Sequence, residues 1–154
     1  FQIPVFCADH VPYLARACNA SASAGSCVPS SEGSDDFAFL GDAKVFAFSG
    51  IARNQAFRSL LASRIGSLAG FAEYPDHYAY SEADLAGLEK RATALNADFL
   101  VTTEKDYPRL GGRLSGRLPL VVVGVRMVFC NDDEADFMAL FRKKLERGKR
   151  EDGS

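Results

Sequence analysis

The run "PLVVVGV", residues 119–125, limits the possible folds of this chain more than any other stretch. Three consecutive valines follow a leucine with no polar residue between them, so the strand that they predict is buried on both faces. Strands of this kind are typical of parallel sheets whose two faces are covered by helices. The run therefore favours an α/β fold.

The segments around this run alternate between strand and helix patterns. Apolar runs that end in turn residues predict strands, and apolar residues at helical spacing predict helices. The expected strands are 45–50, 67–73, 98–102 and 119–125, and the expected helices are 54–65, 81–95, 103–111 and about 133–147. This order predicts a three-layer α/β fold with a mainly parallel sheet of about four to five strands.

The length of 154 residues fits one domain with an additional arm. Residues 1–18 are expected to be an N-terminal arm or hinge segment, and residues 44–150 the α/β lobe. Between them, 19–43 is interpreted as a Ser/Gly-rich linker or loop, because 19–36 has no periodic apolar face. The chain begins without methionine, so we expect it to be a piece of a longer protein.

Composition argues against several functional classes. The net charge of −2 gives no attraction for nucleic acid. No apolar run reaches the ~20 residues that a membrane-spanning helix needs, and the first ten residues lack a signal-peptide pattern. The basic segment 142–150 could contact an anionic membrane surface, but a solvated helix face is the more common reading. The four cysteines lack C-x-x-C spacing, which argues against a zinc or redox motif and leaves one disulfide near the N-terminus open.

Polar residues gather at the predicted carboxyl ends of three strands. In open parallel sheets, ligands bind just beyond these ends. The segments Ser49–Gly50, Tyr74–His77 and Thr102–Asp106 all fall there. We therefore expect a site along this edge of the sheet.

Two of these segments also have a purely structural interpretation. The turn "SGIARN", 49–54, can cradle an anion with its backbone N–H groups, but it is neither a Rossmann nor a Walker motif, and ordinary turn chemistry is favoured. In "TTEKD", 102–106, helix capping accounts for the hydroxyl and the last carboxylate, and the helix dipole for the glutamate. The residues that remain candidates for lining a cleft are Ser49, Gly50, Arg53, Thr103, Glu104 and Lys105.

His77 is one of only two histidines in the chain. Asp76, which precedes it, and Tyr78 and Tyr80, which follow it, are possible orienting partners. Imidazole is the side chain best suited to proton transfer near neutral pH. From position alone, a catalytic role and a role as a turn residue remain equally open. His10, in the N-terminal arm, has no cluster of polar residues around it.

Three motifs, in this order and at this spacing, resemble the C-terminal half of the tetraacyldisaccharide 4'-kinase family. They are "FAFSGIARNQAF" at 46–57, "YPDHYAYSEADL" at 74–85 and "ADFLVTTEKDYPRL" at 97–110. The chain departs from the family pattern at Tyr78, where many members have a second histidine, and at Asn54, where proline is common. Only the first histidine of the motif therefore carries over.

The resemblance implies the smaller lobe of a two-lobed P-loop-type kinase of Gram-negative bacteria. Such an enzyme transfers the γ-phosphate of ATP, with Mg²⁺, to the 4'-hydroxyl of a tetraacylated disaccharide 1-phosphate in lipid A biosynthesis. The P-loop and an activating carboxylate would lie in an N-terminal lobe, so the chain alone is expected to be inactive and to contain no metal or cofactor site. The complete enzyme would be cytoplasmic and peripheral to the inner membrane.

In that arrangement the resemblance gives His77 a catalytic role. It would face the cleft between the lobes, pair with the N-lobe carboxylate and assist departure of the hydroxyl proton. Asp76 would orient the imidazole ring. The alternative is a stand-alone, non-catalytic α/β ligand-binding or regulatory module. The kinase lobe and the stand-alone module differ in one expectation. A lobe separated from its partner exposes the apolar surface that faced that partner, whereas a complete module has no such exposed surface.

Overall fold

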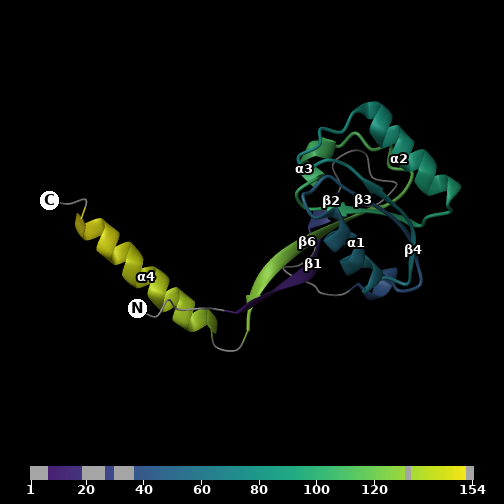
Figure 1. Ribbon diagram of the computed structural model, residues 1–154. Coiled ribbons are helices and arrows are strands. Elements are labelled where there is room, and N and C mark those ends of the chain that lie inside the picture. The colour runs from purple at the N-terminus through teal and green to yellow at the C-terminus, as the bar shows by residue number, and fades with distance from the viewer. Residues whose placement is uncertain (1–6, 19–26, 30–36, 131–132, 152–154) are drawn as a thin grey trace. The chain divides into compact units, whose positions relative to one another are not determined.

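The computed structural model describes residues 7–18, 27–29, 37–130 and 133–151 (Figure 1). It contains one mixed sheet with helices on both faces. The strands are β1 (Ala8–Cys18), β2 (Cys27–Pro29), β3 (Lys44–Ser49), β4 (Ser67–Glu73), β5 (Phe99–Thr103) and β6 (Leu120–Phe129). The helices are α1 (Asn54–Ala62), α2 (Glu82–Ala94), α3 (Tyr107–Leu110) and α4 (Asp133–Glu151), with a 3-10 turn at Ala38–Leu40.

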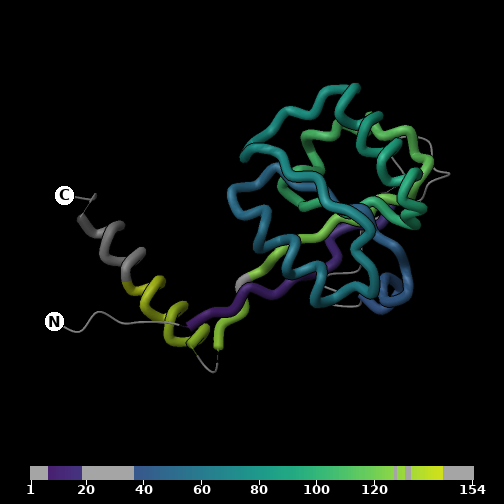
Figure 2. The backbone as a smooth tube through the Cα atoms, turned by 45° about the vertical axis from the view of Figure 1, so that its right-hand side comes forward, coloured from purple at the N-terminus to yellow at the C-terminus, as the bar shows by residue number. Residues whose placement is uncertain are grey.

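The sheet has the strand order β2-β1-β6-β5-β3-β4. Strand β3 pairs in parallel with both β4 and β5, and β5 pairs in parallel with β6. Strand β1 lies beside β6, as the backbone trace shows, and β2 joins β1 in antiparallel orientation (Figure 2). The parallel strands place their carboxyl ends at one edge of the sheet, where the loops after β3, β4 and β5 meet.

Alternating residues of the central strands bury two separate cores. On one face Phe46 and Phe48 pack with Leu85 and Leu88 of α2. On the other face the neighbouring strand residues pack with α1; this second core includes Val45, Ala47, Phe57, Leu61, Val101 and Val121. Both faces of the parallel strands are therefore covered, as the valine run at 119–125 predicts.

The expected α/β layer with a mainly parallel sheet is confirmed. The sheet has six strands instead of about four to five, because β1 and β2 extend it beyond β6. Strand β2 also lies inside the segment expected as a linker, most of which falls outside the described residues. Polar and small residues dominate that part of the sequence, so no apolar alternation marks the short strand.

The helix boundaries differ from expectation by a few residues. Helix α1 ends at Ala62 instead of residue 65. Helix α3 begins at Tyr107, although the Thr103 hydroxyl does accept a hydrogen bond from the Asp106 N–H (3.1 Å), as a capping residue would. It ends at Leu110, and Gly111 follows as its C-cap, near the expected stop; the φ of 57° at Gly111 is the left-handed conformation that glycine adopts without strain.

The capping box predicted at the start of α2 is present. The Ser81 hydroxyl accepts from the Asp84 N–H (3.1 Å), and the Asp84 carboxylate accepts from the Ser81 N–H (2.9 Å). The Ser81 hydroxyl also donates to the Asp84 carboxylate (2.6 Å), and chiefly this hydrogen bond, together with that from the Ser81 N–H, holds the pKa of Asp84 below its ordinary value. The box fixes where α2 begins and so limits the path of the preceding loop, 74–80.

The chain divides into two compact units, one of residues 12–124 and one of residues 1–11 with 125–154. In the second unit the Cys130 N–H donates to the Cys7 carbonyl oxygen, and the Cys7 N–H donates to Asp133. The thiols of Cys7 and Cys130 are free, with their Sγ atoms 2.9 Å apart. Cys18 is disulfide-bonded and lies opposite Cys27 in the β1–β2 register. Among the described residues, no helix is both long and apolar enough to span a bilayer.

Candidate functional site

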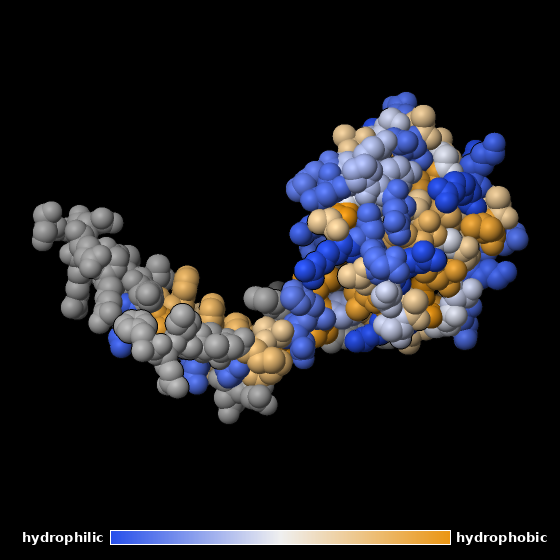
Figure 3. Space-filling view, in the orientation of Figure 1, coloured by the Kyte–Doolittle hydropathy of each residue, from blue (hydrophilic) through white to orange (hydrophobic). Residues whose placement is uncertain are grey.

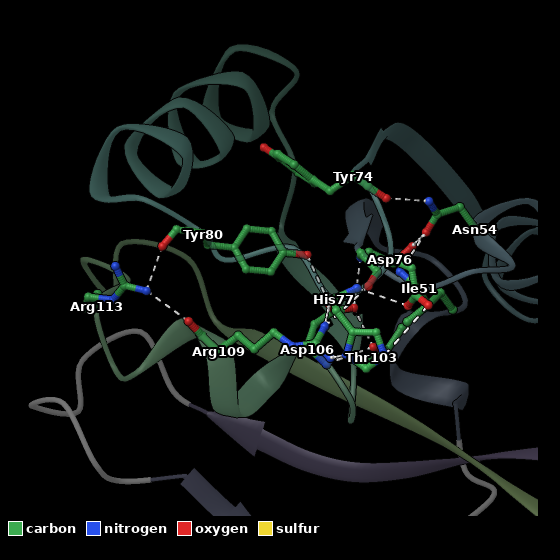
Figure 4. A network of polar contacts seen from close by, with 12 residues as sticks. Ile51, Asn54, Tyr74, Asp76, His77, Tyr80, Thr103, Asp106, Arg109 and Arg113 are labelled. Atoms are coloured by element: carbon green, nitrogen blue, oxygen red, sulfur yellow. Dashed lines mark hydrogen bonds and ion pairs between the residues drawn. The ribbon is translucent and has the colours of Figure 1, made fainter.

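The loops after β3, β4 and β5 converge on the carboxylate of Asp106 (Figure 4). Asp106 is fully buried. One carboxylate oxygen, Oδ2, accepts from the Gly50 N–H (3.1 Å) and from the Thr103 hydroxyl (2.6 Å). The other, Oδ1, accepts from the Tyr80 hydroxyl (3.2 Å) and from Arg109 Nη1 (3.1 Å). A single buried carboxylate thus connects all three loops.

Tyr80 lies in the loop that precedes α2, and its hydroxyl donates to this carboxylate. It is almost fully buried, with its ring edge-to-face against Phe48. Burial, and to a lesser extent the negative charge of Asp106, raise the pKa of Tyr80 far above its ordinary value. The phenol therefore stays protonated and keeps donating its hydrogen bond to Asp106.

Arg109 carries the positive charge that balances Asp106. Its Nη1 also donates to the Gly50 carbonyl oxygen (3.3 Å), and its Nη2 contacts Nδ1 of His77 at 2.9 Å. The side chain is 23% exposed, so it sits at the boundary between the buried network and solvent. Its own carbonyl oxygen accepts from Arg113, which also donates to the carbonyl of Tyr80.

His77 occupies the outer end of this network. Its backbone has a φ of 59°, a left-handed conformation that is uncommon for a residue with a side chain. The His77 N–H donates to the Gly50 carbonyl oxygen (3.1 Å) and contacts the Asp76 carboxylate (3.1 Å), which together hold this conformation. The side chain is 79% exposed, and its Nε2 lies 3.8 Å from Asp76 Oδ2, too far for a hydrogen bond.

Three tyrosines form an aromatic cluster beside His77. The rings of Tyr74 and Tyr78 lie 4.7 Å apart, and both contact the ring of Tyr80. The Tyr78 hydroxyl donates to Asp84 in the capping box (3.2 Å). The cluster therefore ties the loop that carries His77 to the start of α2.

The turn after β3 is held by Asn54. Its Oδ1 accepts from the Ser49 hydroxyl (2.6 Å), and its Nδ2 donates to the Tyr74 carbonyl oxygen (2.8 Å). Asn54 thus joins the loops after β3 and β4. The residue that departs from the common family pattern here has a clear structural role.

The structure brings together only part of the residues expected at the site. Gly50, Asp76, His77 and Thr103 share the network around Asp106. Ser49 is buried next to it. The other candidates, Arg53, Glu104 and Lys105, are exposed, and the Glu104 carboxylate accepts a hydrogen bond from the Tyr13 hydroxyl (2.6 Å).

Two members of the network, Asp106 and Arg109, were not among the expected site residues, and Tyr80 was expected only as a possible orienting partner of His77. Asp106 belongs to the segment 102–106 that was expected at this edge, but its carboxylate was interpreted as a capping group. The spacing of Asp106 and Arg109, three residues apart, was a usable signal, because side chains at this spacing are neighbours on a helical turn. Nothing local to Tyr80 indicates that its hydroxyl reaches a carboxylate 26 positions later.

The described residues contain no group of three or more histidine, cysteine or acidic side chains able to hold a metal ion. The sequence also lacks the G-x-x-x-x-G-K-[ST] pattern that cradles nucleotide phosphates. The described residues therefore show neither of these two arrangements for holding Mg²⁺ or ATP.

Sequence comparison places the chain in a known family. The profile of the family described as tetraacyldisaccharide-1-P 4'-kinase matches residues 7–146. The chain belongs to this family. The match includes all three segments that meet at Asp106, and it confirms the resemblance carried by the motifs at 46–57, 74–85 and 97–110. No solved structure gives a significant match.

Curated relatives of the chain are named tetraacyldisaccharide 4'-kinase. The one from Syntrophus aciditrophicus is 35% identical over 60% of this chain and 25% of its own length. The one from Paramagnetospirillum magneticum is 36% identical over 73% of this chain and 33% of its own length. The one from Rickettsia canadensis is 44% identical over 40% of this chain and 19% of its own length. The chain thus spans about a fifth to a third of the length of these relatives.

Proposed function

We propose that this chain is the smaller lobe of a kinase that phosphorylates the 4'-hydroxyl of tetraacyldisaccharide 1-phosphate in lipid A biosynthesis. The observation that carries the proposal is the family match over residues 7–146 together with the short coverage of the relatives. In this proposal, an N-terminal P-loop lobe of the same protein binds ATP and Mg²⁺. The lipid disaccharide is bound between the lobes at the inner-membrane surface.

Exposed apolar side chains in the unit of residues 1–11 and 125–154 support the proposal that this chain docks against another lobe. Val125 and Val128 on β6 are 50% and 42% exposed, and Met138 and Phe141 on α4 are 40% and 51% exposed. Figure 3 shows hydrophobic residues at the surface of the α4 segment. Apolar side chains of this size are normally covered when they occur in groups. Their exposure therefore favours the interpretation of this chain as a lobe that packs against another part of the protein, and it argues against a complete stand-alone module.

His77 is the residue in this chain to which we assign a direct role. During transfer, the 4'-oxygen bonds to the γ-phosphorus, the bond to the bridging oxygen of ADP breaks, and the hydroxyl proton must leave. A carboxylate of the other lobe would accept that proton, and His77 would hydrogen-bond to this carboxylate. The exposed imidazole at the carboxyl edge of the sheet can reach a group outside the chain, whereas the buried Asp106 cannot.

The test uses the full-length natural protein that contains this chain. We expect His77→Ala to lower kcat for disaccharide phosphorylation by about 10²-fold or more, the usual scale of acid–base assistance. The free energy of unfolding should change by less than ~1 kcal/mol, because the side chain is mostly exposed. His10→Ala, the other histidine, is the matched control and should leave both quantities unchanged.

Two results would overturn the assignment. Normal turnover per folded molecule with a large loss of stability would make His77 a structural turn residue. Magnesium-dependent ATP hydrolysis by the 154-residue chain alone would contradict the assignment of nucleotide binding to another lobe.

A further inference from the structure

The contact between Arg109 and His77 determines which imidazole nitrogen carries the proton. Arg109 Nη2 lies 2.9 Å from His77 Nδ1 (Figure 4). A guanidinium group has only donors and stays charged in proteins, so it cannot accept a hydrogen bond. Nδ1 must therefore supply its lone pair to this contact. In the neutral ring, the proton is then on Nε2.

Arg109 is well placed to impose this arrangement because its other nitrogen is anchored. Nη1 donates to the buried Asp106 carboxylate (3.1 Å) and to the Gly50 carbonyl oxygen (3.3 Å). The same carbonyl oxygen accepts from the His77 N–H (3.1 Å). The backbone of His77 and the guanidinium that faces its ring thus share one fixed acceptor. A planar, doubly anchored guanidinium loses little further entropy when it makes one more hydrogen bond.

We propose that Arg109 is a positioning residue that holds His77 as the Nε2–H tautomer and turns a hydrogen-bond donor toward the outside of the network. The Nε2 atom is the part of the ring away from Arg109, and it lies beyond hydrogen-bond distance of Asp76 Oδ2. It is therefore open to an acceptor from outside the described residues.

This inference rests on the proposed function and narrows the role of His77 within it. A donor at Nε2 orients a carboxylate and stabilises its negative charge, while the carboxylate itself takes the hydroxyl proton. The opposite role, in which Nε2 takes the proton directly, needs the ring proton on Nδ1. That proton would face a donor N–H of Arg109, so the geometry opposes it. His77 therefore assists the base and is not itself the base.

The tautomer can be read directly in the 154-residue chain. Imidazole ¹⁵N chemical shifts and two-bond ¹H–¹⁵N couplings distinguish protonated from unprotonated ring nitrogens. The chain has two histidines, so a His10→Asn variant assigns both sets of signals. At a pH where both rings are neutral, we expect a single Nε2–H form for His77. The exposed His10 should show the averaged signals of two exchanging tautomers.

The variants test whether Arg109 is the cause. Arg109→Met removes the donor, and His77 should then show averaged signals like those of His10. Arg109→Lys keeps a cationic donor and should preserve more of the single form. Backbone ¹H–¹⁵N spectra of each variant establish that it is folded. A wild-type proton on Nδ1, or an unchanged tautomer in folded Arg109→Met, would overturn the proposal.

Kinetics of the full-length protein separate this inference from the proposed function. Arg109→Met should lower kcat by about 10-fold or more, since misplacing a group by ~1 Å can cost about 10²-fold, and Arg109→Lys should recover part of the loss. If the tautomer depends on Arg109 but His77→Ala leaves phosphorylation unchanged, the catalytic role proposed for His77 fails and the structural inference holds. If His77→Ala is inactive but the tautomer is independent of Arg109, only the positioning role is lost.

Discussion

Replacing Asp106 by alanine is the most direct test of the network at the sheet edge. The substitution removes the acceptor for four donors, which come from Gly50, Tyr80, Thr103 and Arg109. Breaking a buried ion pair by removing one partner costs about 3–5 kcal/mol, because the remaining charge is left without compensation. Arg109 is 23% exposed and can regain some hydration. We therefore expect a loss at the lower end, about 3 kcal/mol.

Asp106→Asn separates charge from shape. The amide has nearly the same volume, but its NH₂ group places two donors against donors that are already there. We expect a loss of about 2 kcal/mol, in the range of hydrogen bonds to charged groups. The matched control is Asp98→Ala. Asp98 is exposed and accepts from the Lys44 N–H (2.8 Å), so its removal should cost about 1 kcal/mol or less.

Urea unfolding measures all three variants. Far-UV circular dichroism reports the fold, and tyrosine fluorescence reports the cluster around Tyr80, because the chain has no tryptophan. The midpoints, at a common denaturant slope, give the differences in unfolding free energy. If Asp106→Ala is no less stable than Asp98→Ala, then the buried carboxylate does not organise the three loops and the reasoning above is refuted.

Three further predictions follow from other parts of the structure. Gly66→Ala should destabilise the chain by about 1–3 kcal/mol in urea unfolding, because the new Cβ would overlap the carbonyl oxygen of Gly41. Gly87→Ala is the contrasting variant: this position lies in helix α2 with free space around it, so the substitution should stabilise the chain by about 0.5–1 kcal/mol. Folding lowers the pKa of Asp84, so the stabilisation by its ionised carboxylate is present above pH ~4 and is lost as the pH falls further. The difference in unfolding free energy between the wild type and Asp84→Asn should therefore shrink as the pH is lowered below ~4. The hydrogen bond with the Cys7 thiol is the main cause that raises the pKa of Cys130 to about 12. Little Cys130 thiolate is therefore present at pH 8, so this residue should be alkylated slowly in the wild type and faster in Cys7→Ala.

The sequence was informative where a residue acts on its immediate neighbours. The capping box of Ser81 and Asp84 and the helix stop at Gly111 depend on atoms within a few positions of one another. The valine run of β6 is similar, because burial on both faces removes the need for polar residues at any position. These features defined the α/β layer and the edge at which polar residues gather.

Strands β1 and β2 could not be recognised in this way. Most of β1 is only partly buried or exposed, with only two of its residues buried, so its side chains show no clean alternation. Its place in the sheet comes from backbone pairing with β6, and backbone hydrogen bonds leave little trace in side-chain composition. The strands at this end of the sheet are therefore harder to predict than the parallel strands in its centre.

The sequence alone determined that His77 belongs to a motif at the carboxyl edge of a parallel sheet, because strand ends and turn residues are local properties. Only the tertiary structure shows which side chains the imidazole contacts there. Arg109 lies 32 positions away from His77, and Asp106 lies 56 positions from Gly50. The tautomer follows from the meeting of these side chains across three loops. That meeting depends on strand order and on the burial of a carboxylate, and no single stretch of sequence encodes either.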